Sequence, residues 1–95
     1  MVKVDATALK LPELGWAPDP TRHHITRAPY NREPYVRASV DGVSVDAKAI
    51  GWTREHVQLK WQADGETYTR WVFAKDVVRI GRDESRWRDP YDERD

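Results

Sequence analysis

The chain has 95 residues, no cysteine, and 16 Lys plus Arg against 16 Asp plus Glu, so its formal net charge is zero. The lack of cysteine excludes a disulfide framework and a thiolate zinc site, and the even charge balance argues against a dedicated nucleic-acid binder, which usually carries a basic excess. No apolar run approaches the ~20 residues that span a bilayer, and the start of the chain lacks the apolar segment of a signal peptide, so we expect a cytoplasmic protein with no membrane partner.

Residues 1–34 are predicted to form a Pro-rich extended arm, because they hold all but one of the 6 prolines. Proline fixes φ and biases the preceding residue toward extended conformations. Four side chains of the arm are too apolar for a free tail: Leu9, Leu11, Leu14 and Trp16. We therefore expect residues 1–16 to pack against the rest of the fold or against a partner.

Residues 35–80 are predicted to form an all-β domain of short antiparallel strands. Two Asp-Gly pairs, Asp41-Gly42 and Asp64-Gly65, interrupt stretches of alternating polar and apolar residues. This pattern is the strongest short-range signal for a hairpin, because a type I′ turn needs positive φ at both central positions. The strands that it predicts are Tyr35–Val40, Val43–Ile50, Val57–Gln62 and Thr67–Phe73.

The turns also predict the register of both hairpins. A two-residue turn at Asp41-Gly42 places Arg37 opposite Asp46 on a solvent face, with the alternate residues facing a core. The predicted core residues are Val36, Ala38, Val40, Val43, Val45, Ala47, Val57, Leu59, Val72 and Val77. The second turn pairs Trp61 with Tyr68 on the core face, where small domains need large side chains.

The stretch Arg70-Trp71-Val72-Phe73-Ala74-Lys75-Asp76-Val77 resembles the end of an SH3-like barrel. In such barrels the fourth strand leads through one 3₁₀ turn into a short final strand, which would here be Val77–Ile80. The resemblance implies a small SH3-like barrel of about five strands over residues 35–80, related in architecture to SH3 and Tudor domains.

No catalytic or cofactor signature accompanies the strands, so we expect a protein that is not an enzyme and has no cofactor. His23, His24 and His56 are the only residues that suggest a metal site. Neighbouring side chains in an extended segment point in opposite directions, so we interpret these histidines as surface or packing residues and predict no metal.

A set of aromatic and arginine side chains predicts a partner-binding surface, because Trp, Tyr and Arg dominate interface hot spots. Trp71 and Phe73 lie two apart on one strand and should share its outward face. Such a pair should be covered by the chain's own N-terminal arm, by a second copy or by a partner. The full set of candidate partner-binding residues is Trp52, Arg54, Arg70, Trp71, Phe73, Trp87 and Tyr91.

Residues 81–95 are predicted to be a charged tail whose two aromatic residues are Trp87 and Tyr91. Its composition is typical of a segment that is disordered in isolation and becomes ordered on a partner. A tail that stays solvated is the alternative interpretation.

These features together predict a non-enzymatic protein-interaction or adaptor module. It would be an accessory or structural component of a larger assembly, such as a phage particle, and its partner would be another protein or a second copy of itself. The alternative is RNA or single-stranded DNA binding, with bases stacked on the aromatic and arginine face.

Overall fold

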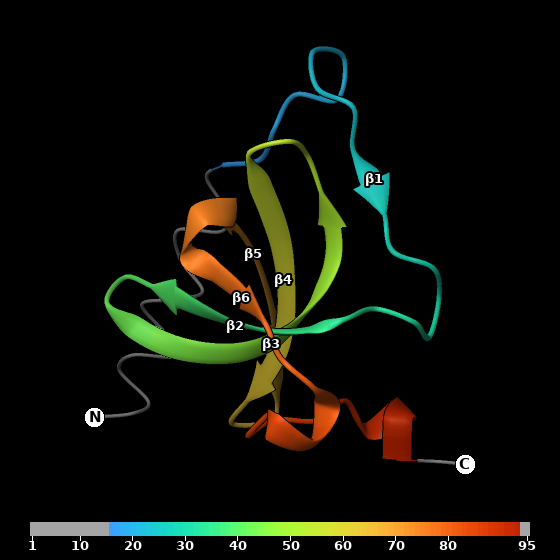
Figure 1. Ribbon diagram of the computed structural model, residues 1–95, viewed down its shortest axis with the longest axis vertical. Coiled ribbons are helices and arrows are strands. Elements are labelled where there is room, and N and C mark those ends of the chain that lie inside the picture. The colour runs from blue at the N-terminus through green and yellow to red at the C-terminus, as the bar shows by residue number, and fades with distance from the viewer. Residues whose placement is uncertain (1–15, 94–95) are drawn as a thin grey trace.

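Six strands and three short 3₁₀ turns form the part of the chain that the structure, a computed structural model, describes: residues 16–93 (Figure 1). The strands are β1 (Thr26–Arg27), β2 (Tyr35–Val40), β3 (Val43–Trp52), β4 (His56–Ala63), β5 (Glu66–Phe73) and β6 (Val77–Arg79). The 3₁₀ turns are η1 (Ala74–Asp76), η2 (Arg82–Glu84) and η3 (Pro90–Glu93). The predicted all-β class is confirmed.

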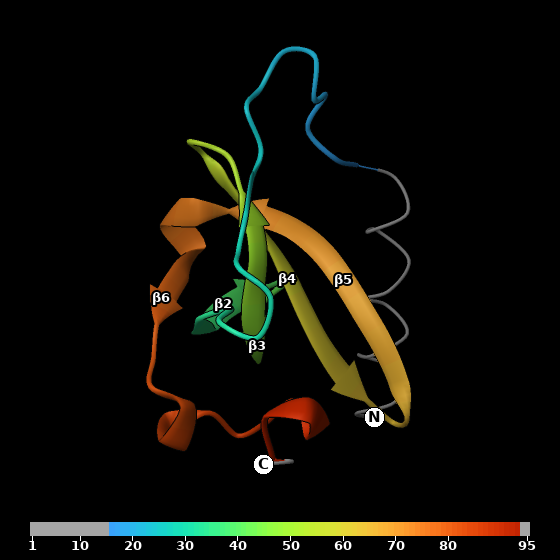
Figure 2. The same ribbon diagram turned by 90° about the vertical axis from the view of Figure 1, so that its right-hand side faces the viewer.

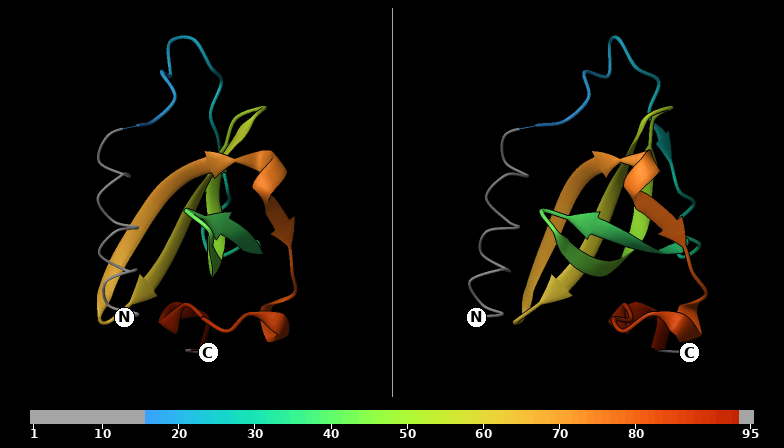
Figure 3. Two further views of the ribbon diagram at one scale, coloured as in Figure 1. Left: turned by 90° about the vertical axis from the view of Figure 1, so that its left-hand side faces the viewer. Right: turned by 60° about the vertical axis from the view of Figure 1, so that its left-hand side comes forward.

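All strand pairs are antiparallel, and the order in the sheet is β5-β4-β3-β2-β6, with β1 paired to the end of β3. Strands β2 to β5 follow one another as a meander, and β6 returns through η1 to pair with β2. Strands β5 and β6 therefore lie at opposite ends of the sheet (Figure 2 and Figure 3), and within the described residues no ladder joins them.

Both Asp-Gly pairs form the predicted turns. The φ angles are 51° at Asp41 and 80° at Gly42, and 54° at Asp64 and 79° at Gly65. Positive φ at both central positions matches the twist of the flanking strands, which is why these two dipeptides set the register. The pairs Val40–Val43, Arg37–Asp46 and Trp61–Tyr68 all lie opposite each other as predicted.

Strand β3 is longer than predicted and continues through Trp52, which the sequence had placed in the following loop. The register shifts between Ala49 and Gly51 where β3 pairs with β4. One extra residue on a strand inverts the alternation beyond it. The shift brings Trp52 opposite Val57, so that Trp52 packs against the core.

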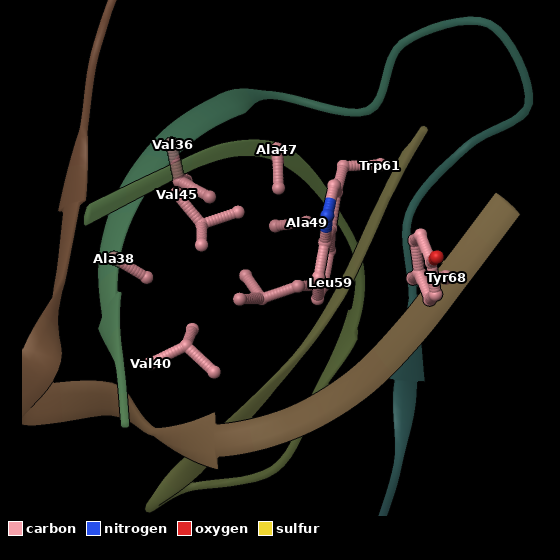
Figure 4. Packing of buried hydrophobic residues seen from close by; sticks show 9 residues of the cluster. All are labelled: Val36, Ala38, Val40, Val45, Ala47, Ala49, Leu59, Trp61 and Tyr68. Carbon is pink, nitrogen blue, oxygen red and sulfur yellow. The ribbon is translucent and has the colours of Figure 1, made fainter. Parts of the chain in front are cut away.

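The core lies inside the curved sheet (Figure 4). Its buried residues are Val36, Ala38, Val40, Val45, Ala47, Ala49, Leu59, Trp61 and Tyr68. The other four predicted core residues, Val43, Val57, Val72 and Val77, are partly buried against this cluster. The rings of Trp61 and Tyr68 stack with centroids 5.6 Å apart.

Residues 81–93 form a folded segment, here called the C-terminal strap, which turns back across one end of the sheet (Figure 1). Ser85 and Asp89 of the strap are buried. The strap differs from the predicted charged tail because its backbone and side-chain polar groups bond to side chains of β2 and β3, which composition alone does not reveal.

Candidate functional site

A cleft of about 620 Å³ lies between β5 and the turn that joins β2 to β3. It is here called the aromatic cleft, and its apolar and aromatic lining consists of Trp16, Val40, His56, Trp71, Val72 and Phe73. The cleft lies along β5, at one end of the strand order of the described residues, and it also includes His56 at the start of β4.

The alternation of β5 positions the main aromatic side chains of this cleft. Trp71 lies opposite Gln58 and Phe73 opposite His56, whereas Val72 between them packs against the core cluster. Phe73 remains 53% exposed. Exposed apolar side chains are informative where they gather into a patch, and here Phe73 shares the cleft with Trp16 and Trp71.

The rings of Trp16, His56 and Phe73 form a column on the outer face of the sheet. The centroids of Trp16 and His56 are 4.5 Å apart, and those of His56 and Phe73 are 4.7 Å apart. The ammonium of Lys75 lies 5.7 Å from the centroid of Phe73, within reach of a cation–π contact. The end of the arm thus meets the sheet at Trp16, whereas the predicted contacts of residues 1–15 lie outside the described residues.

Arg70 connects the two sides of the aromatic cleft. Its Nη1 and Nη2 donate to Oδ2 and Oδ1 of Asp41 at 2.7 Å and 3.1 Å. Such a bidentate pair holds both side chains in a fixed geometry. Arg70 therefore bridges β5 to the β2–β3 turn, and its charge is balanced by Asp41.

The remaining predicted site residues separate into two other regions. Trp52 and Arg54 line a second cleft of about 580 Å³ beyond the Trp16–His56 pair, which forms a wall of both clefts. Trp87 is half-buried against the core, with its ring centroid 6.1 Å from that of Tyr35. The structure therefore brings Arg70, Trp71 and Phe73 together but places Trp87 on the chain's own sheet.

Tyr91 lies in η3 of the strap and is exposed. Its backbone N–H donates to Oδ1 of Asp89 at 3.0 Å. It lines neither the aromatic cleft nor the second cleft.

The strap covers a buried carboxylate that sequence reasoning had placed in solvent. Asp46 is 5% exposed. Nε of Arg37 donates to it at 2.7 Å, and the backbone N–H and Nε of Arg86 donate at 2.7 Å and 3.2 Å. The bond from Arg37, together with those from Arg86, holds the pKa of Asp46 well below its ordinary value although burial opposes the shift.

A second buried charge lies beside it on β3. Nζ of Lys48, a residue only 3% exposed, lies 3.3 Å from Asp89, 3.1 Å from Asp92 and 3.2 Å from Glu33. Burial opposes the charge, but these carboxylates outweigh it and raise the pKa of Lys48. Burial, together with a 2.5 Å hydrogen bond donated to Asp92, raises the pKa of Tyr35 to about 12.

The buried charges of Asp46 and Lys48 stabilise the fold and are not a binding site, because each already pairs with opposite charges of the same chain. Within residues 16–93, no group of three or more His, Asp or Glu side chains could hold a metal ion. The helices of the same residues are also too short and polar to cross a membrane.

No known protein family matches the chain, and no curated protein or solved structure gives a significant match.

Proposed function

We propose that the protein is a cytoplasmic, non-enzymatic adaptor built on an SH3-like barrel, whose aromatic cleft binds an extended segment of a partner protein. The observation that carries this proposal is the position of the cleft. The cleft runs along β5, which pairs with only β4 among the described residues, and it is lined there by the exposed Phe73 and the half-buried Trp71.

The order of the elements supports the SH3-like assignment. A four-strand meander leads through one 3₁₀ turn, η1, into a short strand that pairs with the first strand of the meander. The Arg70–Asp41 pair bridges the open side of the sheet, which brings β5 near the β2–β3 turn as in a small barrel.

The chemistry of an edge strand supports the mode of binding. One edge of β5 offers backbone N–H and C=O groups that a partner strand can pair with. In such strand addition the backbone hydrogen bonds supply affinity and side-chain pockets supply specificity. Trp71 and Phe73 stand beside this edge and would act as the anchors, because aromatic side chains in desolvated pockets dominate interface energetics.

The partner in this proposal is a component of a larger assembly, such as a phage particle, to which a chain of this size would be an accessory. A second copy of the chain is the other possible occupant. The nucleic-acid alternative is less well supported at the aromatic cleft, because the charge of Arg70 is balanced by Asp41.

A capture experiment in extracts of the source cell tests the proposal. The tagged wild-type chain should retain one specific protein, identified by mass spectrometry, and the Trp71→Ser/Phe73→Ser variant should lose it. Val78→Ser is the matched control, because Val78 is an exposed apolar residue at the opposite edge of the sheet.

The salt dependence of binding distinguishes the nucleic-acid alternative from the adaptor proposal. Affinity for a nucleic acid falls steeply as the salt concentration rises, because bound phosphates release counterions. A protein held by apolar contacts should instead remain bound. Retention of nucleic acid at low salt, with loss at high salt and no protein retained, would contradict the adaptor proposal.

A further inference from the structure

The cleft beyond the Trp16–His56 wall has a lining that the adaptor proposal does not use. It is here called the basic cleft, and its charged and aromatic lining residues include Arg22, His23, His24, Trp52, Arg54 and His56. The 3 histidines of the chain all meet here, although the sequence separates them into two segments. Against two arginines the lining contains a single carboxylate, Glu55.

Local hydrogen bonds shape the first of the two loops that form the cleft. The carboxylate of Asp19 accepts from the backbone N–H and the hydroxyl of Thr21 at 2.9 Å and 2.8 Å. The backbone carbonyl of Asp19 accepts hydrogen bonds from the backbone N–H groups of Arg22 and His23, both at 3.0 Å. This turn presents Arg22 and His23 to the cleft.

The second loop joins β3 to β4 and is fixed in the same way. Oγ1 of Thr53 accepts from the backbone N–H groups of Glu55 and His56 at 3.3 Å and 3.1 Å. The short strand β1 pairs Thr26 with Trp52 and so ties the first loop to the second (Figure 1). Hydrogen bonds to backbone groups therefore fix both loops that form the cleft.

The arginine charges of the cleft are available to a ligand. Within the described residues, neither Arg22 nor Arg54 forms an ion pair, and both are exposed. Guanidinium groups bind phosphate oxygens in a planar, bidentate geometry. The Asp19 carboxylate accepts two hydrogen bonds from Thr21.

The aromatic walls supply a second recognition element. Trp52 is half-buried against the core and is a rigid surface, and Trp16 is 47% exposed beside His56. Nucleobases stack on such side chains, and each stacked base contributes about 1–3 kcal/mol by alanine substitution. The volume of about 580 Å³ lies in the range of small-ligand sites.

We propose that the basic cleft binds a nucleotide, with the phosphate on Arg22 and Arg54 and the base against the tryptophan walls. The nucleotide can be a free mononucleotide or one unit of a single strand, because both present the same ring and phosphate. The phosphate end of the site is separate from the proposed partner surface, since Arg22 and Arg54 do not line the aromatic cleft, whereas Trp16 and His56 form the wall that the two clefts share.

Titration calorimetry of the full chain tests this proposal with adenosine monophosphate, adenosine, inorganic phosphate, phosphotyrosine and a short oligoadenylate. Adenosine monophosphate should bind more tightly than adenosine or phosphate alone, because only it engages both elements. Arg22→Ala and Arg54→Ala should each weaken its binding by roughly tenfold. Arg32→Ala removes the same charge from an exposed loop outside this cleft and should change the affinity little.

The oligoadenylate distinguishes a site for free mononucleotides from a site for single-stranded nucleic acid. An affinity per site equal to that of the mononucleotide assigns the cleft to free nucleotides, and a much tighter one assigns it to single strands. The proposal is overturned if adenosine monophosphate does not bind, if phosphotyrosine binds more tightly, or if Arg32→Ala weakens binding as much as Arg54→Ala. Circular dichroism of each variant confirms that the fold is intact.

Discussion

Asp46 and Lys48 show how a strand can bury charge. They alternate with Val45 and Ala47, so they point away from the core, and Asp46 was predicted to face solvent. The strap instead covers that face, and its own charged groups provide the partners. Burial of a charge is tolerated only when it is paired and hydrogen-bonded, and both residues meet this condition.

Replacing Asp46 with Ala should destabilise the protein by about 2 kcal/mol, because hydrogen bonds to charged groups are lost while the exposed arginines can return to water. Chemical denaturation measures the change. Asp83→Ala is the matched control, since Asp83 is an exposed carboxylate of the same strap. Equal stabilities of the two variants would show that Asp46 does not hold the strap.

The pH dependence of stability follows from the same carboxylate. Because the pKa of Asp46 is lowered on folding from 3.8, its contribution is fully present above that value and is lost as the pH falls below it. The melting temperature of the wild type should therefore drop below pH 4. Asp46→Asn should melt at a lower temperature near neutral pH but show a weaker drop in acid, which a series of thermal melts would reveal.

At the scale of elements, the two hairpins could be predicted from the sequence because their signal is local. An Asp-Gly pair needs no information from elsewhere in the chain to select its turn. The bulge near Ile50 could not be predicted in this way, because it depends on the pairing of β3 with β4 and on the approach of β1. A Cβ on Gly51 would lie 3.3 Å from the backbone carbonyl oxygen of Thr26 in β1, a tight contact that favours glycine at this position.

The strap could not be predicted because its contacts join distant parts of the sequence. Arg86 reaches Asp46 and Asp89 reaches Lys48, each across some forty residues of chain. Composition reports only that the segment is charged, and charged segments are commonly disordered.

Deleting residues 81–95 tests the role of the strap. Removal should lower the melting temperature strongly, because it leaves Lys48 and Asp46 without most of their partners and uncovers the core beside Trp87. Thermal unfolding followed by circular dichroism measures this. A truncated chain with the same melting temperature as the wild type would support the interpretation that the segment is a solvated tail.

At the scale of the whole molecule, the candidate surface divides into two clefts. The alternation of β5 was sufficient to predict that Trp71 and Phe73 share a face. Their neighbours could not be predicted, because Trp16 and His56 reach the cleft from the arm and from the start of β4. The basic cleft could not be predicted from the sequence for the same reason, since the pairing of β1 with β3 brings its two loops together.

The most direct test of the adaptor proposal is the dissociation constant of the captured partner for the wild type and for Trp71→Ser/Phe73→Ser. One well-desolvated aromatic anchor contributes about 2 kcal/mol or more, so the affinity should fall by more than tenfold. Val78→Ser should bind as the wild type does, and all three proteins should keep the same circular dichroism spectrum. An unchanged dissociation constant for the folded double variant would contradict the proposed partner surface.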